Sequence, residues 1–204
     1  DGTVAAAYGA NVTVKDGAAQ DNAAEISGGT VTGNAYGGAL TAVAATKNAA
    51  GGNAHITGGS VGGNVYGGAI MDAVAGDVTG SSGAQTDDNQ ILLSGATVTG
   101  DVVGGTSAGG TGNMLAIYPG QSAIHDFSGV QKLRFYLPND ARASYTPMLQ
   151  LGVAAKDIRN LNIGVGFSGS APVLHGNDVI SLMKTLPGGT LLTDADIANQ
   201  IEGT

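Results

Sequence analysis

The chain has 204 residues, which is long enough for a hydrophobic core. Because 42% of the residues are apolar but only 4% are aromatic, that core must be built from Val, Ile, Leu and Ala. It contains no cysteine, which excludes disulfides, thiolate metal sites and cysteine nucleophiles. The net charge is −8, and no Lys or Arg lies between Lys47 and Lys132. A nucleic-acid partner and an anionic membrane surface are therefore excluded, and no apolar run is long enough to span a bilayer.

The first part of the chain repeats one glycine-rich block. All five prolines and all three phenylalanines lie beyond residue 113, whereas 26 of the 36 glycines lie before it. This composition divides the chain into repeats at 1–113 and a second region at 114–204. The copies of the block are Val4–Ala10 (partial), Ile26–Ala39, Ile56–Ala69 and Leu93–Gly105. Asp1 runs directly into repeat-like sequence, so we expect the chain to be a piece of a longer one.

Each copy reads as short strands joined by tight turns. β-Branched residues stand between glycine pairs, and no period of 3.6 residues occurs. One copy cannot bury its own apolar face, but stacked copies can, with Ile26 beside Ile56 and Val31 beside Val61. The sequence therefore predicts an all-β fold, a right-handed parallel β-helix (β-solenoid). The repeats are too short for propeller blades, too poor in leucine for leucine-rich repeats and lack the collagen period.

Equivalent positions in the copies carry Tyr8, Tyr36, Tyr66 and Val103, which are 28, 30 and 37 residues apart. The block stays constant while the segment between copies lengthens, so we expect the insertions to lie in loops on one side. The tyrosines form a line that either packs, which we favour, or stacks on sugars.

The longest insertion is the most interesting loop, because loops on rigid scaffolds often carry recognition. Its aspartates are the candidate binding residues of the chain, either for a partner or for a loosely held cation, although a solvated loop is the interpretation we favour. The spacing matches neither the DxDxDG pattern nor the calcium-binding nonapeptide. These candidates are Asp72, Asp77, Asp87 and Asp88.

The region 114–204 is expected to be irregular β-structure that caps the open end of the stack. Thr193–Gln200 could begin a short helix with Thr193 as its cap. The expected strands are 114–118, 133–137, 148–151, 161–165 and 179–183.

Three motifs that suggest chemistry have simpler interpretations. Gly164–Gly169 matches a dinucleotide-binding pattern, but no helical period follows it, so we expect a turn. Gly105–Gly109 matches a nucleophile elbow, but glycine surrounds it, so we expect a loop. His55, His125 and His175 lack ligand spacing, and His55 falls at the position of Glu25, which suggests an outward side chain. We expect no catalytic residue, metal or cofactor.

Two stretches carry a resemblance to a known family. "GGTVTGNAYGGA" and "GGSVGGNVYGGA" resemble the Tyr-Gly-Gly repeats of autotransporter (type V secretion) passengers of Gram-negative bacteria. "SGVQKLRFYLPND" at 128–140 looks like the "FYLP" segment near the C-terminal end of such passengers, and 160–183 is similar to the next segment of those passengers. The resemblance implies a secreted β-helical passenger, at the cell surface, in the outer membrane or outside the cell. A membrane would be reached only through a barrel domain absent from this chain.

The expected function is that of a non-catalytic adhesin or aggregation factor that binds host or bacterial surface glycans or proteins through loops on a rigid stalk. A β-helical carbohydrate-active enzyme is the rival hypothesis. It would need clustered acids and commonly Lys or Arg in one groove, whereas the repeat region has no Arg and its aspartates lie on loops. A purely structural spacer is the third hypothesis.

Overall fold

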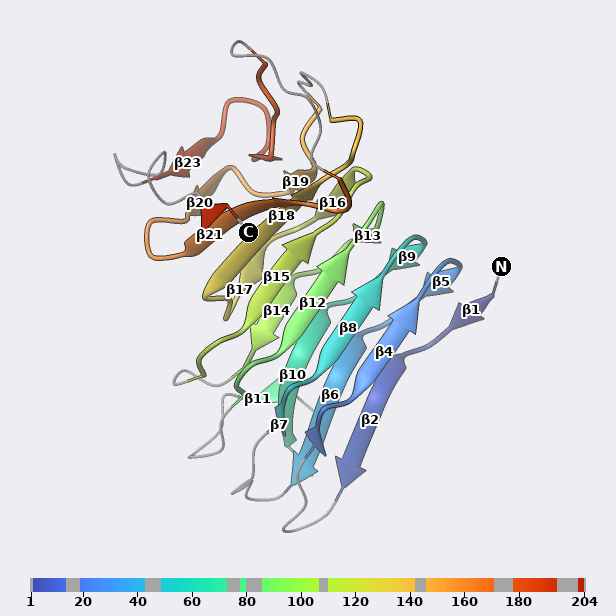
Figure 1. Cartoon of the computed structure of the whole chain (residues 1–204). Coiled ribbons are helices and arrows are strands. Elements are labelled where there is room, and N and C mark those ends of the chain that lie inside the picture. Colours follow the sequence, from blue (N-terminus) through green and yellow to red (C-terminus); the bar gives the residue numbers. More distant parts are fainter. Residues whose placement is uncertain are drawn as a thin grey trace.

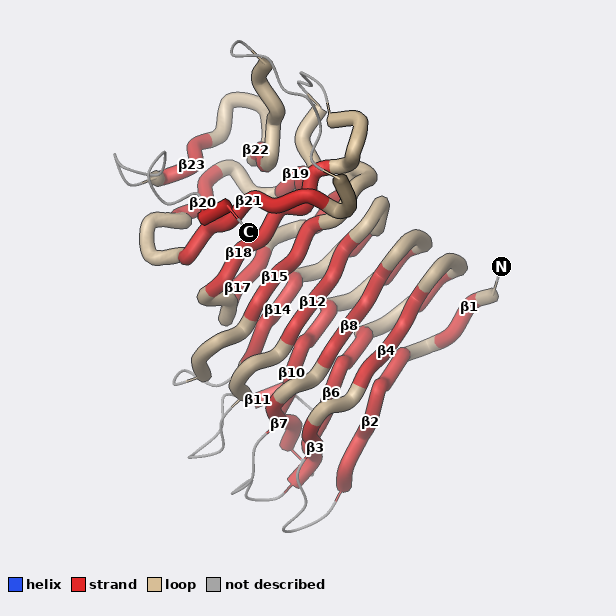
Figure 2. Tube along the Cα trace, viewed as in Figure 1, coloured by secondary structure: helices blue, strands red, loops and turns tan. Residues whose placement is uncertain are grey.

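The computed structural model describes residues 2–13, 19–42, 49–72, 78–79, 86–106, 110–141, 146–170, 178–193 and 202–203. Within these ranges every regular element is a strand, and the strands form three long sheets and two small ones (Figure 2). The all-β expectation is therefore confirmed for the described residues. Between the described strands all pairings are parallel except that of β10 with β11.

Seven short strands form the first sheet. In spatial order they are β1 (Thr3–Val4), β5 (Thr30–Val31), β9 (Ser60–Val61), β13 (Thr97–Val98), β16 (Ser122–Ile124), β19 (Leu149–Leu151) and β22 (Met183–Lys184). The second sheet contains β2 (Ala7–Thr13), β6 (Ala35–Ala42), β10 (Val65–Asp72), β14 (Val102–Gly105) and β17 (Phe127–Ser128), with β11 (Val78–Thr79) on β10.

The third sheet again has seven strands. They are β4 (Ala23–Ile26), β8 (Asn53–Ile56), β12 (Gln90–Leu93), β15 (Met114–Ile117), β18 (Lys132–Leu137), β21 (Asn162–Phe167) and β24 (Glu202–Gly203). The two small sheets pair β3 (Ala19–Gln20) with β7 (Ala49–Ala50), and β20 (Ala155–Asp157) with β23 (Thr190–Leu192).

From β1 to β18 the chain visits the first, second and third sheets in turn and then returns to the first, and beyond β18 the strands β20 and β23 of a small sheet take the place of the second sheet. We call one such passage a circuit, and the first circuit is β1, β2 and β4. Successive circuits lie side by side along the molecule, from the blue N-terminal strands to the orange and red C-terminal ones (Figure 1). The sheets continue across residue 113, because β15 pairs with β12 and β16 pairs with β13.

The expected stacking of equivalent residues is confirmed. Ile26 pairs with Ile56 and Ile56 with Leu93, while Val31 pairs with Val61 and Val61 with Val98. These residues are among a single buried cluster that continues through Leu115, Leu133 and Phe135 in the later circuits. The core is therefore a row of like residues shared by the three long sheets. Burial of each such side chain contributes roughly 1.5–3 kcal/mol to the stability of the fold.

The segments that vary in length connect the second sheet to the third. They follow β2, β6, β10 and β14 in the chain, and they contain the positions at which the copies differ in length. The fixed blocks provide the other two corners. Within the repeats of 1–113, insertions are thus confined to one of the three corners, as the repeat spacing predicts.

The C-terminal region agrees with the predicted strands at four places out of five. β15, β18, β19 and β21 lie where strands are expected, but the run at 179–183 contributes only Met183 to a strand, β22. That run crosses the corner between the third and first sheets, where Val179 is 56% exposed and Ile180 lines a pocket. The expected helix at Thr193–Gln200 lies outside the described residues beyond Thr193.

Candidate functional site

Two of the four candidate aspartates have described side chains. Asp72 ends β10 and its Cα pairs with that of Ala42, but its side chain is outside the described part, as is the whole of Asp77. Asp87 and Asp88 precede β12 at the corner that carries the insertions. Among the described side chains, the candidates that lie together are Asp87 and Asp88, which are neighbours in the sequence.

The carboxylate of Asp87 is used within the fold. Its Oδ1 accepts hydrogen bonds from the backbone N–H of Thr111, at 2.7 Å, and from the Thr111 hydroxyl, at 3.3 Å. Thr111 lies one circuit further along the chain, so the bonds join neighbouring circuits. Among the described residues no group of three or more His, Asp and Glu is placed to hold a metal ion.

Asp88 occupies a left-handed backbone position, with φ at +50°. The equivalent residues in the preceding and following circuits, Gly51 and Gly112, have φ of +64° and +74°. Asp21, which lies one circuit before Gly51, has φ of +51°. Only Gly, Asn and Asp visit this region readily. The corner geometry therefore accounts for Asp88 without a ligand.

Buried amides line the interior beside this corner. Asn89, which is 1% exposed, accepts a hydrogen bond at Oδ1 from the backbone N–H of Gly52 and donates from Nδ2 to Oδ1 of Asn113. The backbone N–H of Asn113 donates in turn to Oε1 of Gln131. Each amide joins its own circuit to the next, which satisfies backbone groups that would otherwise be buried without partners.

The predicted line of tyrosines is present on the second sheet. Tyr36 stacks on Tyr8 with ring centroids 4.8 Å apart and on Tyr66 with centroids 5.0 Å apart, and Val103 follows in register. Tyr36 is 3% exposed and Tyr66 7%, so packing, the favoured alternative, is confirmed for both, while Tyr8 is 43% exposed.

The hydroxyls of the inner tyrosines are also satisfied. Asn34 Nδ2 donates to the Tyr36 hydroxyl at 2.8 Å, and Asn64 Nδ2 donates to the Tyr66 hydroxyl at 2.9 Å. Burial raises the pKa of Tyr36, although the bond from Asn34 opposes the shift. The ladder is therefore closed to large ligands at Tyr36 and Tyr66.

A second tyrosine pair lies on the third sheet, where the repeat pattern gave no reason to expect one. Tyr118 directly follows β15 and Tyr136 lies in β18, and their rings stack with centroids 4.4 Å apart. Both rings are half-buried. The pKa of Tyr118 is raised mainly by burial and to a smaller extent by the neighbouring Tyr136. The signal for the pair is the recurrence of an apolar strand with tyrosine shortly before proline, in "AIYP" and "FYLP".

Arg134 lies two residues before Tyr136 on the same strand. Its Nη1 donates to the backbone oxygens of Leu133, at 3.3 Å, and Asn162, at 2.8 Å. The side chain passes over Gly164, where a Cβ would lie 2.9 Å from Arg134 Cδ. In the described part of the chain the guanidinium is therefore held by backbone oxygens and by no acidic side chain.

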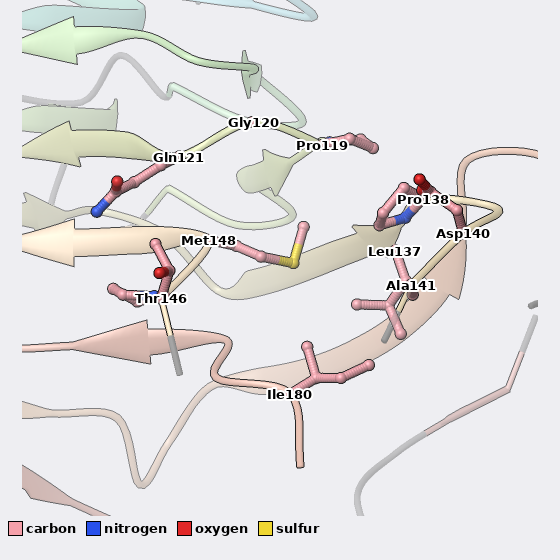
Figure 3. Close-up of a pocket in the computed structure, with 11 residues that line it drawn as sticks. Pro119, Gly120, Gln121, Leu137, Pro138, Asp140, Ala141, Thr146, Met148 and Ile180 are labelled. Carbon is pink, nitrogen blue, oxygen red and sulfur yellow. The ribbon is translucent and has the colours of Figure 1, made fainter. Parts of the chain in front are cut away.

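A pocket of about 310 Å³ lies at the corner between the third and first sheets (Figure 3). The connections that form it lengthen along the chain, from 118–121 to 138–148 and 168–182. Leu137, Met148 and Ile180 contribute apolar walls, while Gln121 and Asp140 are polar lining residues. Its size is at the lower limit of small-molecule sites.

The structure describes two of the three histidines, and they belong to no group of three or more potential metal ligands among the described residues. His55 pairs with Glu25 in register and faces away from the core, as expected, but its Nε2 is buried and has no hydrogen-bond partner among the described residues. His125 lies at an exposed corner with Nδ1 2.7 Å from Asp101 Oδ1. His175 is outside the described residues.

One of the two glycine motifs differs from its prediction. Gly164–Phe167 lie in β21 and only the residues after them bend, so the expected turn at Gly164 is wrong. A strand is possible there because Gly164 leaves room for Arg134 on the neighbouring strand. In the second motif Gly105 ends β14, and Ser107–Gly109 lie outside the described residues.

Comparison of the chain with known protein families, with curated proteins and with solved structures found no match. Within the described residues we find no helix that has the length and apolar character needed to cross a membrane. The molecule thus offers a set of surfaces: a closed tyrosine ladder, an open tyrosine pair beside Arg134, a corner pocket and a corner that carries the variable segments.

Proposed function

We propose that the chain is a segment of a right-handed parallel β-helix from a surface-exposed autotransporter passenger, and that it acts as a non-catalytic adhesin or aggregation factor. In this proposal the stack of circuits provides a stiff scaffold. Segments at the insertion-bearing corner, together with side chains on the outer sheet faces, contact glycans or proteins of other cells.

The observation that carries the proposal is the in-register pairing of whole circuits. β6 pairs with β10 over seven aligned positions, and β18 pairs with β21 over six. A parallel pair needs a crossover connection, which the other two long sheets provide as far as β19 and in which β20 or β23 of a small sheet replaces the second sheet beyond it. A coiled path of this kind is the simplest one consistent with the strand order.

The handedness follows from a general rule. About 98% of connections between parallel strands of one sheet are right-handed, because twisted strands return to their sheet most easily in that direction. Here each of the three long sheets contains several such connections, so a right-handed coil is the proposed form.

A binding role is supported by the chemistry of the described surface. The side chain of Asp87 bonds within the fold and Asp88 fits a backbone requirement, so neither needs a reaction to explain it. The resemblance to autotransporter passengers and the half-buried tyrosine–arginine region on the third sheet favour a surface protein that holds a ligand. We place it at the cell surface.

The test is surface display of the 204-residue chain on a bacterium that does not aggregate. We expect the cells to settle faster than cells that display an unrelated β-rich protein of the same size, or to adhere to a host-cell layer. Unchanged settling and adhesion would contradict the proposal and favour the spacer hypothesis. Turnover of a polysaccharide would favour the enzyme.

A further inference from the structure

The outer face of the third sheet changes character near β18. Alternate residues of β18 face away from the core, because Leu133 and Phe135 lie within it. The outward residues are therefore Lys132, Arg134 and Tyr136. We call Tyr118, Arg134 and Tyr136 the aromatic–basic patch.

The patch is basic within an acidic protein. The outward positions of β15, β18 and β21 carry two cations, Lys132 and Arg134, and no Asp or Glu. The chain as a whole has a net charge of −8. A local cation on such a surface favours an anionic group of a ligand over the rest of the molecule.

The tyrosines of the patch differ from those of the closed ladder. In the ladder, asparagine side chains bind the hydroxyls of Tyr36 and Tyr66. The hydroxyls of Tyr118 and Tyr136 have no hydrogen-bond partner within the described part of the chain, although both rings are half-buried and fixed by stacking. Two rigid phenols are thus left with unused donors and acceptors.

Arg134 is fixed in the same way. The two backbone oxygens use Nη1 alone, and Nε and Nη2 have no partner among the described residues. A guanidinium held by backbone contacts can bind a carboxylate with two parallel hydrogen bonds, and little side-chain freedom is then lost on binding.

The spacing of the three side chains suits a compact ligand. Arg134 and Tyr136 are two residues apart on one strand of a parallel sheet, which places their Cα atoms about 6.6 Å apart, and Tyr118 is one strand away from Tyr136, at about 4.8 Å. A ring that carries hydroxyls, a C–H face and a carboxylate would meet all three groups at once. Nucleic acid also combines rings with negative charge, but the charge of the whole chain opposes a polyanion of high charge density.

We propose that the aromatic–basic patch binds an acidic sugar, a carboxylate-bearing residue of a polysaccharide such as a uronic acid. The carboxylate pairs with Arg134, the sugar hydroxyls bond to the phenols of Tyr118 and Tyr136, and the C–H groups of the sugar contact the ring edges. The inference deepens the proposed function, on which it rests for the claim that the patch meets polysaccharides.

The experiment is titration of the full chain with a galacturonic acid trimer, followed by calorimetry and by saturation-transfer NMR. A neutral galactose trimer of the same length is the ligand control. We expect the acidic trimer to bind and the neutral one to bind at least tenfold more weakly. Absence of binding by the acidic trimer at millimolar concentration, or equal affinity for both, would overturn the proposal.

Three variants locate the site. Arg134→Gln is expected to weaken binding about tenfold or more, since it removes a charge-assisted pair. Arg159→Gln is the matched control, because Arg159 is an exposed arginine that pairs with Asp157 elsewhere, and we expect a change of less than twofold. The double variant Tyr118→Phe, Tyr136→Phe keeps both rings and is expected to weaken binding about fivefold while the unfolding midpoint stays unchanged.

If Arg134→Gln and Arg159→Gln lower the affinity for the acidic trimer equally, the trimer responds only to the overall charge of the chain, and the proposed site at the aromatic–basic patch is overturned. The result is independent of the display test. Trimer binding without settling or adhesion would contradict the proposed function alone, and settling or adhesion without trimer binding would contradict the patch alone.

Discussion

The tyrosine ladder on the second sheet leads to a graded prediction for stability. Tyr36 is 3% exposed and stacks on two rings, whereas Tyr8 is 43% exposed and stacks on one. Replacement of a buried aromatic residue by alanine costs about 3–5 kcal/mol. We therefore expect Tyr36→Ala to lower the free energy of unfolding by about 4 kcal/mol.

Tyr8→Ala removes about half as much buried surface and one stacking contact, so we expect a loss of about 1–2 kcal/mol. Tyr36→Phe keeps the ring and removes only the acceptor for Asn34 Nδ2, so a loss of about 1 kcal/mol is expected. The three variants thus separate ring packing from the hydroxyl contact.

Urea denaturation measures the three losses, and hydrogen exchange shows which circuits open, because stacked repeats need not unfold as one unit. The expected order of destabilisation is Tyr36→Ala, then Tyr8→Ala, then Tyr36→Phe, the last two being close. If Tyr8→Ala costs as much as Tyr36→Ala, the ladder does not pack as described and the reasoning fails.

Three further predictions concern other parts of the stack. A Cβ on Gly67 would lie 2.7 Å from a backbone oxygen of the next circuit, so we expect Gly67→Ala to lower the free energy of unfolding, measured by urea denaturation, by more than about 1 kcal/mol. A Cβ on Gly28 would meet nothing within 4 Å, so we expect Gly28→Ala to change the same quantity by less than about 1 kcal/mol. Similar results for the two variants would contradict the close packing of circuits. His55→Leu removes a buried nitrogen without a partner among the described residues, so we expect stability to rise by about 1 kcal/mol, and a thermal midpoint below that of the wild type would argue against this. Hydrogen bonds from Arg159 lower the pKa of Asp157 to about 2 from its ordinary value of 3.8. The stability contributed by the ionised Asp157 is therefore present above pH 3.8 and disappears as the pH falls toward 2. NMR titration of this carboxyl tests the pKa, and Asp157→Asn is expected to make the free energy of unfolding less dependent on pH in that interval.

The sequence predicted the stacking well because one copy of the block repeats the packing problem of the next. Ile26 and Ile56, or Tyr36 and Tyr66, face the same neighbours, so the register follows from the repeat alone. The same reasoning placed His55 outward, since Glu25 precedes it in register.

Prediction failed where the period changes. Tyr118 and Tyr136 stack although they are only 18 residues apart, because the circuit between them is shorter than the repeats. Their pairing emerges only when Ile117 is aligned with Phe135 strand by strand. The run at 179–183 is apolar enough for a strand, but it crosses a corner that has widened, where Ile180 faces a pocket instead of a sheet.

The amides at Asn89 and Asn113 do not follow from composition either. Asparagine is typical of turns, and nothing in the sequence distinguishes an exposed asparagine from one that is 1% exposed. Their role depends on the position of Gly52 in the preceding circuit, which only the fold provides.

The pairing of each circuit only with its neighbours has a mechanical consequence. Tension applied between the two ends of the stack would detach circuits singly, since each is bound to the remainder by three short strands. One repeat of 30 residues, once peeled away, adds about 100 Å of extended chain. The protein would then yield in a series of similar extensions, dissipating load gradually instead of rupturing at a single threshold.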